Sequence, residues 1–247
     1  MKISIVTVCL NSQETIVSAV RSVCEQDYPD IEYVVIDGGS QDNTLTLIAP
    51  YQGKLATVVS EPDQGIYDAM NKGLALATGE VVGFLNADDM YADTDVVRRI
   101  AEQFCDPCVD ACYGDLIYVD PRDPQRITRR WHAGIGSKAK LYQGWMPPHP
   151  TFFMRRQCYQ QHGGYRLDMG TAADYELMLR YLLCHDIRAV YLHQVLVQMR
   201  SGGASNTSFK SRFSAHLMDW KAWWVNGLMP YPWTLLCKPL RKLGQWF

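Results

Sequence analysis

Val81-Val82-Gly83-Phe84-Leu85-Asn86-Ala87-Asp88-Asp89 is the stretch that decides the fold of this chain. Its first five residues form an apolar run typical of a buried strand, and residues 86–89 end that run in a polar, acidic cluster. Because ligands of open α/β sheets bind at the carboxyl ends of the strands, this cluster is a candidate binding site. The alternative is a solvated acidic turn, since a short motif is a weak signal by itself.

Two adjacent carboxylates at a strand end repel each other unless a cation or a proton lies between them. Ions of the Mg²⁺ type are held by one or two carboxylates together with the phosphate oxygens of a substrate. We therefore expect Asp88 and Asp89 to hold a divalent ion that carries a diphosphate.

Strands and helices alternate through the first half of the chain. The β-rich runs cover residues 3–10, 31–36, 55–59 and 81–85, and a helical pattern follows each of them. We expect Asn11 to cap the first helix, with Glu14 as its capping-box partner. This order predicts an α/β fold with a doubly wound, mostly parallel sheet, whereas the pattern loosens after Ala111.

The composition excludes some classes of protein. The chain has 247 residues, of which 47% are hydrophobic, so it can bury one large core with or without an appendage. Its net charge of -2 argues against a nucleic-acid partner, which would favour a basic excess.

The first ten residues indicate a strand rather than a signal peptide, so we expect a cytoplasmic protein. The Cys105-x-x-Cys108 spacing has no second pair at zinc-finger distance, which favours incidental thiols.

The turn after the first strand, Cys9-Leu10-Asn11-Ser12, contains no glycine. A dinucleotide-binding unit needs glycines there so that the backbone can approach a pyrophosphate. An NAD-dependent oxidoreductase and a P-loop enzyme are therefore both disfavoured, and a phosphorylated ligand would be held through a metal at Asp88 instead.

Four segments resemble the motifs of one family. In chain order they are Ser4-Ile5-Val6-Thr7-Val8-Cys9-Leu10-Asn11, Val35-Ile36-Asp37-Gly38-Gly39-Ser40-Gln41-Asp42-Asn43-Thr44, Glu61-Pro62-Asp63-Gln64-Gly65-Ile66-Tyr67-Asp68-Ala69-Met70-Asn71-Lys72-Gly73 and Asn86-Ala87-Asp88-Asp89. Together they resemble the family 2 glycosyltransferases, which have the GT-A fold, and among them bacterial polysaccharide enzymes such as those of colanic-acid synthesis. The resemblance covers roughly residues 3–203. It implies an inverting transferase that uses a nucleotide-diphosphate sugar and Mg²⁺ or Mn²⁺.

The resemblance also implies roles on the side of the nucleotide sugar. The metal-binding carboxylate of the family's D-x-D motif falls on Asp88, with Asp89 beside it, and the first acidic position of that motif is Asn86 here. The second acid that many relatives carry after the second strand is Gly38, which leaves the base of the nucleotide open. The nucleotide-sugar-binding residues that the resemblance implies are Asn11, Asp37, Asp63, Asn71, Lys72, Asn86 and Arg200.

Three of these residues have a purely structural alternative. Asp37 could belong to the N-terminal turn of a helix, where a carboxylate is favourable. Lys72 could be a solvated helix lysine, and Arg200 could be a surface arginine beside a glycine turn. By resemblance, the segment Val197–Gly203 closes over the diphosphate as a flexible loop, which gives Arg200 a phosphate contact.

Asp174 is the candidate general base. Its segment, residues 171–181, resembles the family's Glu-Asp-x-x-Leu-x-x-Arg motif, with Ala173 in place of the first acid. Helical spacing puts Asp174 on the same face as the apolar Leu177 and Met178, so it is either a helix cap or a functional carboxylate. The resemblance favours the base, because an acceptor hydroxyl must lose a proton as it attacks.

Residues 148–156 resemble the segment beside the acceptor site of the family, so His149 is assigned to the acceptor side, with a satisfied loop histidine as the alternative. The chain lacks the Gln-x-x-Arg-Trp motif, which argues against a processive synthase.

The C-terminal segment is rich in tryptophan and in basic residues: Trp220, Trp223, Trp224, Trp233 and Trp246 are mixed with Lys221, Lys238, Arg241 and Lys242. This mixture favours a segment that lies in a membrane interface, and the alternatives are a helix packed on the catalytic domain or in a homodimer. No apolar run is long enough to span a bilayer.

We therefore predict a GT-A glycosyltransferase domain over residues 1–205 and a helical appendage over residues 206–247, at the inner face of the cell membrane. It would transfer one sugar, with inversion, from a nucleotide-diphosphate sugar to a saccharide or lipid-linked acceptor in polysaccharide biosynthesis. The alternatives are a sugar-nucleotide nucleotidyltransferase and a non-catalytic nucleotide-sugar-binding protein.

Overall fold

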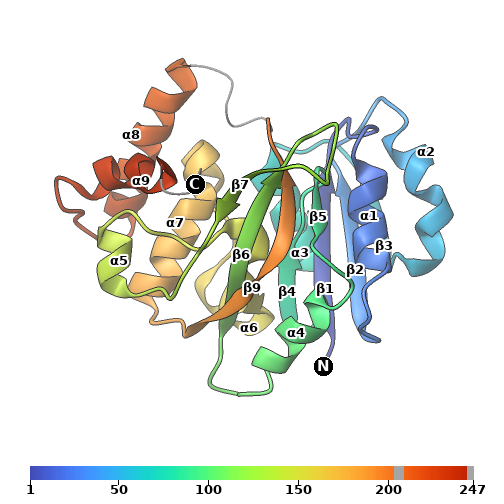
Figure 1. The fold of residues 1–247 in the computed structure, drawn as a ribbon, viewed down its shortest axis with the longest axis horizontal. Coiled ribbons are helices and arrows are strands. Elements are labelled where there is room, and N and C mark those ends of the chain that lie inside the picture. The colour runs from blue at the N-terminus through green and yellow to red at the C-terminus, as the bar shows by residue number, and fades with distance from the viewer. Residues whose placement is uncertain (203–208, 244–247) are drawn as a thin grey trace.

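Nine strands form one mixed sheet in this structure, a computed structural model that describes residues 1–202 and 209–243 (Figure 1). The strands are β1 (Ile3–Cys9), β2 (Ile31–Asp37), β3 (Thr57–Ser60), β4 (Val81–Phe84), β5 (Asp89–Tyr91), β6 (Ala111–Val119), β7 (Ile127–Trp131), β8 (Phe153–Arg155) and β9 (Ala189–Arg200). Their order in the sheet is β3-β2-β1-β4-β8-β6-β9-β5, and β7 pairs with β6.

The first half of the sheet is parallel, as the alternation of strands and helices predicts. β1 pairs with β2 and β4, and β2 pairs with β3, all in parallel. Every residue of β1 is buried, because Ile3 and Ile5 pack on one face of the sheet and Val6 and Val8 pack on the other. A strand buried on both faces must be apolar throughout, which explains the continuous hydrophobic run.

The second half of the sheet is mixed. β8 is antiparallel to both β4 and β6, β5 is antiparallel to β9, and β7 is antiparallel to β6. β6 and β9 are parallel to each other, with register shifts around Asp115. Short strands and long connections give no regular period, which is why the sequence pattern loosens beyond Ala111.

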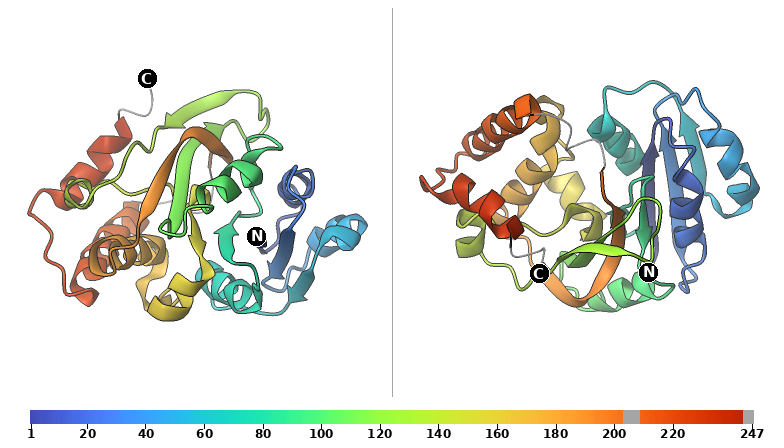
Figure 2. Two further views of the ribbon diagram at one scale, coloured as in Figure 1. Left: turned by 90° about the horizontal axis from the view of Figure 1, so that it is seen from below. Right: turned by 45° about the horizontal axis from the view of Figure 1, so that its top comes forward.

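Helices cover both faces of the sheet. One face is covered by α1 (Ile16–Cys24), α2 (Thr44–Ile48) and α4 (Val96–Gln103), and the other by α3 (Ile66–Leu76), α6 (Arg156–His162) and α7 (Ala173–Leu179). The short helix α5 is Lys138–Tyr142, and the C-terminal helices are α8 (Phe209–Val225) and α9 (Thr234–Leu243). In both views of Figure 2, α8 and α9 lie at the end of the molecule opposite α1 and α2.

Asn11 does not cap the first helix, so that prediction is wrong. The helix begins at Ile16, and a turn in which Ser12 O accepts from the N–H groups of Thr15 and Ile16 precedes it. Asn11 has φ +48°, a left-handed conformation that asparagine tolerates. Its Oδ1 accepts from the N–H of Gln41 at 2.9 Å, so the side chain joins the loops after β1 and β2.

The C-terminal helix α8 packs on α7, and α9 packs on α8. Trp223 is fully buried and donates from Nε1 to the hydroxyl of Tyr175 at 2.9 Å. Lys238 of α9 forms an ion pair with Asp219 of α8 at 2.7 Å. The predicted boundary at residues 205 and 206, and Trp246, lie outside the described residues. In the described ranges, no helix is both long and apolar enough to cross a bilayer.

Candidate active site

The carboxyl ends of β1, β2 and β4 meet at one edge of the sheet, because these strands are parallel and adjacent. This edge carries Asn11 after β1, Asp37 at the end of β2, and Asn86 and Asp88 after β4. The structure therefore brings together residues from three separate sequence segments, as the strand-end pattern predicts.

Asp37 is a fully buried carboxylate that is satisfied by short-range hydrogen bonds. It accepts from the N–H groups of Gly39 (3.2 Å) and Ser40 (3.0 Å) and from the hydroxyl of Ser60 (2.6 Å). Burial opposes ionisation, but hydrogen bonds from Ser40 and Ser60 outweigh it and leave the pKa of Asp37 below its ordinary value. The structure thus holds a permanent negative charge at the end of β2.

Asp63 lies against Gly38. A Cβ placed on Gly38 would lie 2.4 Å from Asp63 Oδ2, so the glycine leaves the space that this carboxylate fills. The other oxygen of Asp63 accepts from the N–H of Gly65 at 2.7 Å. A carboxylate therefore stands beside Gly38, the position at which the family resemblance leads us to expect a second acid.

Asp88 and Asp89 point into different surroundings. Asp88 is partly exposed, whereas Asp89 begins β5 and its side chain is fully buried. The amide of Asn86 donates to Asp89 Oδ2 at 3.3 Å, and Asp89 Oδ1 has no hydrogen-bond partner among the described residues. Burial raises the pKa of Asp89 well above its ordinary value, and the charge of Asp88 raises it further.

These oxygens fit a hard divalent ion. Asp88 offers an accessible carboxylate, and Asn86 Oδ1 and Asp89 Oδ1 are buried oxygens without a partner in the described ranges. No group of three or more Cys, His, Asp and Glu side chains among the described residues could enclose a metal alone. An ion here would need further oxygens from a ligand, which is how Mg²⁺ binds with phosphates.

Arg200 brings a positive charge to the same edge. Its guanidinium donates to the backbone carbonyl of Asp88 at 2.9 Å and to the hydroxyl of Ser18 at 2.8 Å. Val197, Gln198 and Met199 of β9 pair with β5, and Arg200 at the end of β9 pairs with β6. This part of the segment is therefore a strand and not the flexible loop expected. Arg200 therefore has a fixed position next to the paired acids.

Lys72 is directed toward the loop after β3. Its ammonium lies 2.8 Å from Glu61 and 3.6 Å from Asp68, and it donates to the carbonyl of Pro62 at 2.9 Å. These contacts support the loop that carries Asp63. The ammonium group of Lys72 is therefore already paired within the protein, without a phosphate.

Asp174 is the second residue of α7, so it is not the cap of that helix, which falls on Ala172. The carboxylate is partly exposed and accepts from the N–H of Tyr175 at 2.7 Å. It lies near the half-buried ring of Tyr67: burial raises the pKa of Tyr67, and the charge of Asp174 raises it further. Burial lowers the pKa of His149, and the same charge acts in the opposite direction.

Tyr165 connects the surroundings of Asp174 to α3. The side-chain amide of Asn71 accepts from Tyr165 N–H and donates to Tyr165 C=O, both at 2.8 Å. The hydroxyl of Tyr165 lies 2.6 Å from His149 Nε2, and the ring of His149 stacks on Phe84, the last residue of β4. The contact with Phe84 places this second group of residues beside the acidic edge. We name Tyr67, His149, Tyr165 and Asp174 the Asp174 cluster.

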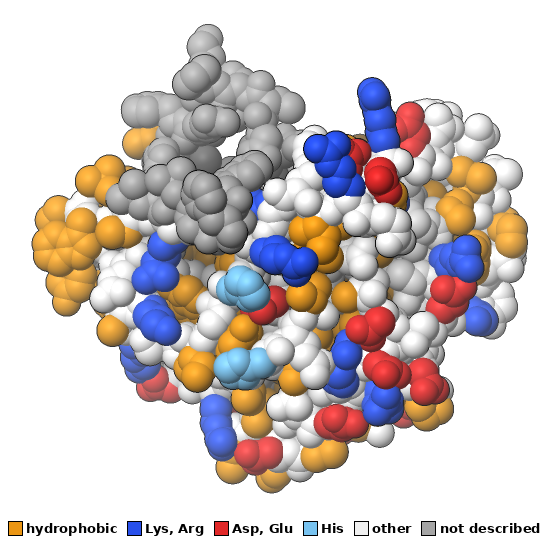
Figure 3. Space-filling view, viewed as in Figure 1, with side chains coloured by type: hydrophobic (Ala, Val, Ile, Leu, Met, Phe, Trp, Pro, Cys, Tyr) orange, Lys and Arg blue, Asp and Glu red, His pale blue; other side chains and the backbone are white. Residues whose placement is uncertain are grey.

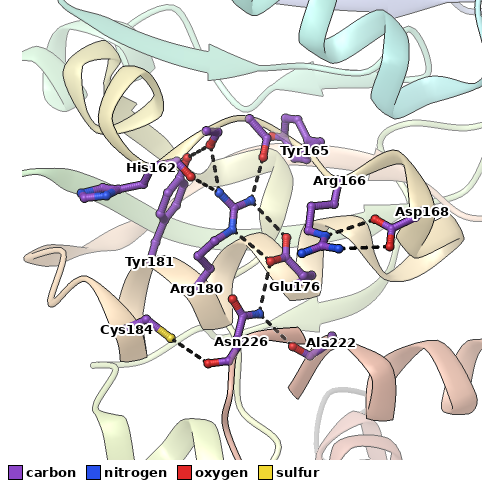
Figure 4. A network of polar contacts seen from close by, with 12 residues as sticks. His162, Tyr165, Arg166, Asp168, Glu176, Arg180, Tyr181, Cys184, Ala222 and Asn226 are labelled. Carbon is purple, nitrogen blue, oxygen red and sulfur yellow. Dashed lines mark hydrogen bonds and ion pairs between the residues drawn. The ribbon is translucent and has the colours of Figure 1, made fainter. Parts of the chain in front are cut away.

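A buried ion pair supports both α7 and Tyr165 (Figure 4). Glu176 is fully buried and accepts from Arg180 at 2.9 and 3.0 Å. Arg180 also donates to the carbonyls of His162, Gly163 and Gly164, directly before Tyr165. Asn226, the residue after α8, donates to Glu176 at 3.2 Å. The prediction from sequence missed Glu176 and Tyr165, and only the four-residue spacing of Glu176 and Arg180 hinted at the pair.

The sequence and the fold both match known proteins. Residues 4–165 match the model of the family described as Glycosyl transferase family 2. A PGL/p-HBAD biosynthesis glycosyltransferase of Mycobacterium bovis (strain BCG / Pasteur 1173P2) is 32% identical over 220 residues, which cover 87% of this chain and 83% of that protein.

Solved structures of low sequence identity share the fold. S. aureus TarS 1–349 in complex with UDP matches with a TM-score of 0.66 and 19% identity, and the match covers 90% of this chain and 65% of that one. The mannosyltransferase PcManGT from Pyrobaculum calidifontis, in complex with GDP-Man and Mn²⁺, matches with a TM-score of 0.67 and 19% identity over 97% of this chain and 69% of that one. These neighbours are GT-A proteins, which confirms the predicted fold.

Proposed function

Because this chain belongs to glycosyl transferase family 2, we propose that it moves one sugar, with inversion, from a nucleotide-diphosphate sugar to a saccharide or lipid-linked acceptor in polysaccharide biosynthesis. The observation that carries the proposal is the meeting of Asp37, Asp63 and Asp88 at one sheet edge, with Asp174 beside that edge. We call the residues that meet at this edge the donor edge. We call the Asp174 cluster, together with the residues that hold it in place, the acceptor side.

The donor edge binds the nucleotide. Asn11 and Asn86 offer polar groups for the ribose, and the buried Asp37 orders the loop beside them through Ser40. Asp63, next to Gly38, offers a carboxylate to the base. Asn71 and Lys72 serve this site mainly by holding Tyr165 and the Asp63 loop in place. Arg200 faces the diphosphate. Solved neighbours hold UDP-GlcNAc and GDP-Man, so the fold accepts more than one base.

Asp88 would hold Mg²⁺ or Mn²⁺ together with the diphosphate, and Asp89 would support Asp88 from the buried side. When bound, the ion neutralises the charge that develops on the departing diphosphate. The neighbour PcManGT was solved with Mn²⁺, which supports a divalent ion in this fold.

Asp174 is the general base of the transfer. The acceptor hydroxyl forms its bond to the anomeric carbon as the bond from that carbon to the diphosphate oxygen breaks, and the hydroxyl proton passes to the carboxylate of Asp174. Attack opposite the leaving group inverts the anomeric configuration. A carboxylate that is partly exposed and held by one backbone N–H can accept this proton.

Membrane contact through the C-terminal helices completes the proposal. Large apolar side chains are exposed on α8, α9 and the turn between them: Leu217, Trp220, Trp224, Met229, Tyr231, Trp233 and Leu236. Lys221 and Arg241 lie among them, and aromatic with basic residues suits an anionic membrane surface. Replacing Trp224 and Trp233 by Ser should abolish binding to anionic vesicles. A loss of self-association in light scattering instead would assign the surface to a homodimer.

A binding and product assay tests the proposed function. We expect UDP or GDP to raise the melting temperature only with Mn²⁺, because a ligand of the folded state stabilises by mass action. Asp88→Ala should remove that metal-dependent shift, and a panel of nucleotide sugars should give a glycosylated product with inverted configuration. Release of pyrophosphate from a nucleoside triphosphate and a sugar phosphate would support a nucleotidyltransferase. Binding without turnover would support a non-catalytic protein.

A further inference from the structure

A second group of titratable side chains lies on β6, on β9 and directly after β7. Its centre is Asp115, which is 6% exposed and accepts three hydrogen bonds. The donors are His132 Nδ1 (2.9 Å), the N–H of Ala133 (2.8 Å) and the hydroxyl of Tyr191 (2.7 Å). In Figure 3, histidine side chains gather near the middle of the face on which β6 and β9 lie.

These bonds orient an exposed imidazole. The side chain of His132 is 74% exposed, although its Nδ1 is held by a buried carboxylate. A carboxylate only accepts, so Nδ1 carries the proton in this bond, and the exposed ring presents Nε2 to a ligand. Burial raises the pKa of Tyr191, and its bond to Asp115 helps to raise it to about 12, so this hydroxyl stays a donor.

Flat rings lie beside these polar groups. Tyr191 stacks on Tyr113, with ring centroids 5.5 Å apart, and the ring of His193 lies 4.2 Å from that of Tyr191. His193 is exposed and Tyr191 is half-buried. A ring face packs on the apolar face of a sugar, and neighbouring nitrogen and oxygen atoms bind its hydroxyls. The group therefore has the composition of a saccharide site.

The group lies on the same face of the sheet as the Asp174 cluster. Tyr113 belongs to the core that covers this face, together with Phe84 and α7. Thr151, two residues after His149, bonds both backbone groups of Gly114, the residue before Asp115, at 3.3 and 3.0 Å. β8 lies between β6 and β4, so β6 and β4 are about 10 Å apart across the sheet. A short oligosaccharide can span this distance.

Two other roles explain less of this arrangement. Asp115 could serve only to hold the loop at Ala133. That role needs the bond from the Ala133 N–H to Asp115 but does not explain why an exposed imidazole is oriented by the same carboxylate. A metal site would need more ligands, and the described residues contain no group of three His, Cys, Asp or Glu that could bind one.

We propose that His132, Tyr191 and His193, held in place by Asp115, form a subsite for a saccharide unit of the acceptor remote from the reacting hydroxyl. This proposal rests on the proposed function and narrows it, because the acceptor must then carry at least two sugars. Asp115 is a positioning residue that acts through His132 and Tyr191.

Direct binding tests the subsite without an assay of transfer. The probes are maltotriose, cellotriose, mannotriose and chitotriose, with the corresponding monosaccharides, added to the full chain with GDP or UDP and Mn²⁺. The readout is NMR of labelled histidine, since the chain has only six. At least one trisaccharide should shift the signals of His132 and His193 and bind more tightly than its monosaccharide.

Variants decide whether the contacts are those proposed. His132→Ala and Asp115→Asn should each weaken trisaccharide binding by about 10-fold or more, the loss expected for a well-oriented hydrogen bond. His193→Ala tests whether the ring of His193 packs on the saccharide. Because this residue is exposed, the variant should fold even if Asp115→Asn does not. His185→Ala is the matched control. It removes an exposed histidine whose ring stacks on His162, outside the proposed subsite, and should leave binding unchanged.

Three results would overturn the subsite: binding that shifts neither His132 nor His193, binding that His132→Ala does not weaken, or no binding of any of the four trisaccharides. The test of the proposed function is separate, because it measures binding of the diphosphate with Mn²⁺. If that binding fails while the trisaccharide still binds, the proposed transfer is wrong and the saccharide site remains.

Discussion

Asp37 at the donor edge is held by side chains that are nearer in the sequence than those that hold Tyr165 and Glu176 on the acceptor side. The side-chain partners of Asp37 at the donor edge, Ser40 and Ser60, lie 3 and 23 residues away. On the acceptor side, Asn71 holds Tyr165 from 94 residues away, and Asn226 bonds Glu176 across 50 residues. Substitutions at the donor edge should therefore change ligand binding more than stability, whereas those on the acceptor side should change stability too.

Asp174→Asn should have the largest effect and is the exception on the acceptor side. The residue is partly exposed and makes one backbone bond, so the fold and the affinity for the nucleotide should remain. Transfer should fall by about two orders of magnitude or more, the usual contribution of a general base. The measurement is the rate of product formation at saturating nucleotide sugar. Asp186→Asn, at an exposed acid, is the control, and an unchanged rate in Asp174→Asn would remove the residue from catalysis.

Glu176→Gln should have the largest effect on stability. The substitution removes the negative partner of Arg180 at a buried site. Because an unpaired buried charge is unfavourable, the free energy of unfolding should fall by about 3–5 kcal/mol. Denaturation by urea measures the loss. The control is Glu25→Gln, which breaks the exposed pair with Arg21 and should leave the midpoint unchanged. Equal midpoints in both variants would contradict a supporting role of the buried pair.

Gly38→Ala should reduce affinity for the nucleotide by about 10-fold, which corresponds to 1.4 kcal/mol. The added methyl group meets the end of the flexible side chain of Asp63, so Asp63 moves while the fold remains. Gly53→Ala is the matched control, because no atom lies within 4 Å of the added Cβ there. In calorimetry, Asp63→Ala should add little to the effect of Gly38→Ala. Additive losses would show that the two residues act separately.

The smallest effect should be the pH dependence that Asp37 gives to stability. Its pKa in the folded protein is lower than the ordinary value of about 3.9, so its stabilising contribution is present above that pH. The contribution is lost as the pH falls through the lower pKa of the folded state. Asp37→Asn should therefore be less stable than the unchanged protein at pH 6, and the difference should shrink as the pH falls below the ordinary pKa of about 3.9. A difference between the two proteins that does not vary with pH would rule out this linkage.

Local patterns identified the donor edge because each of its motifs directly follows a strand. Apolar runs gave β1, β2 and β4 within one residue of their observed ends, and parallel pairing then brought Asp37, Asn86 and Asp88 together. The same approach failed at Asn11, because an extra turn before α1 is not visible in a capping pattern. It also missed Tyr165 and Asp115, whose partners lie in distant segments.

The sequence by itself determined the α/β order, the acidic strand ends and the family, because these depend on short-range periodicity and contiguous motifs. Only the tertiary structure decided that Asp63 fills the space beside Gly38, that Asp89 is buried while Asp88 is accessible, and that α8 packs on α7. The physical reason is that burial and hydrogen bonding are properties of pairs of residues. Which residues become neighbours is set by the packing of the whole chain.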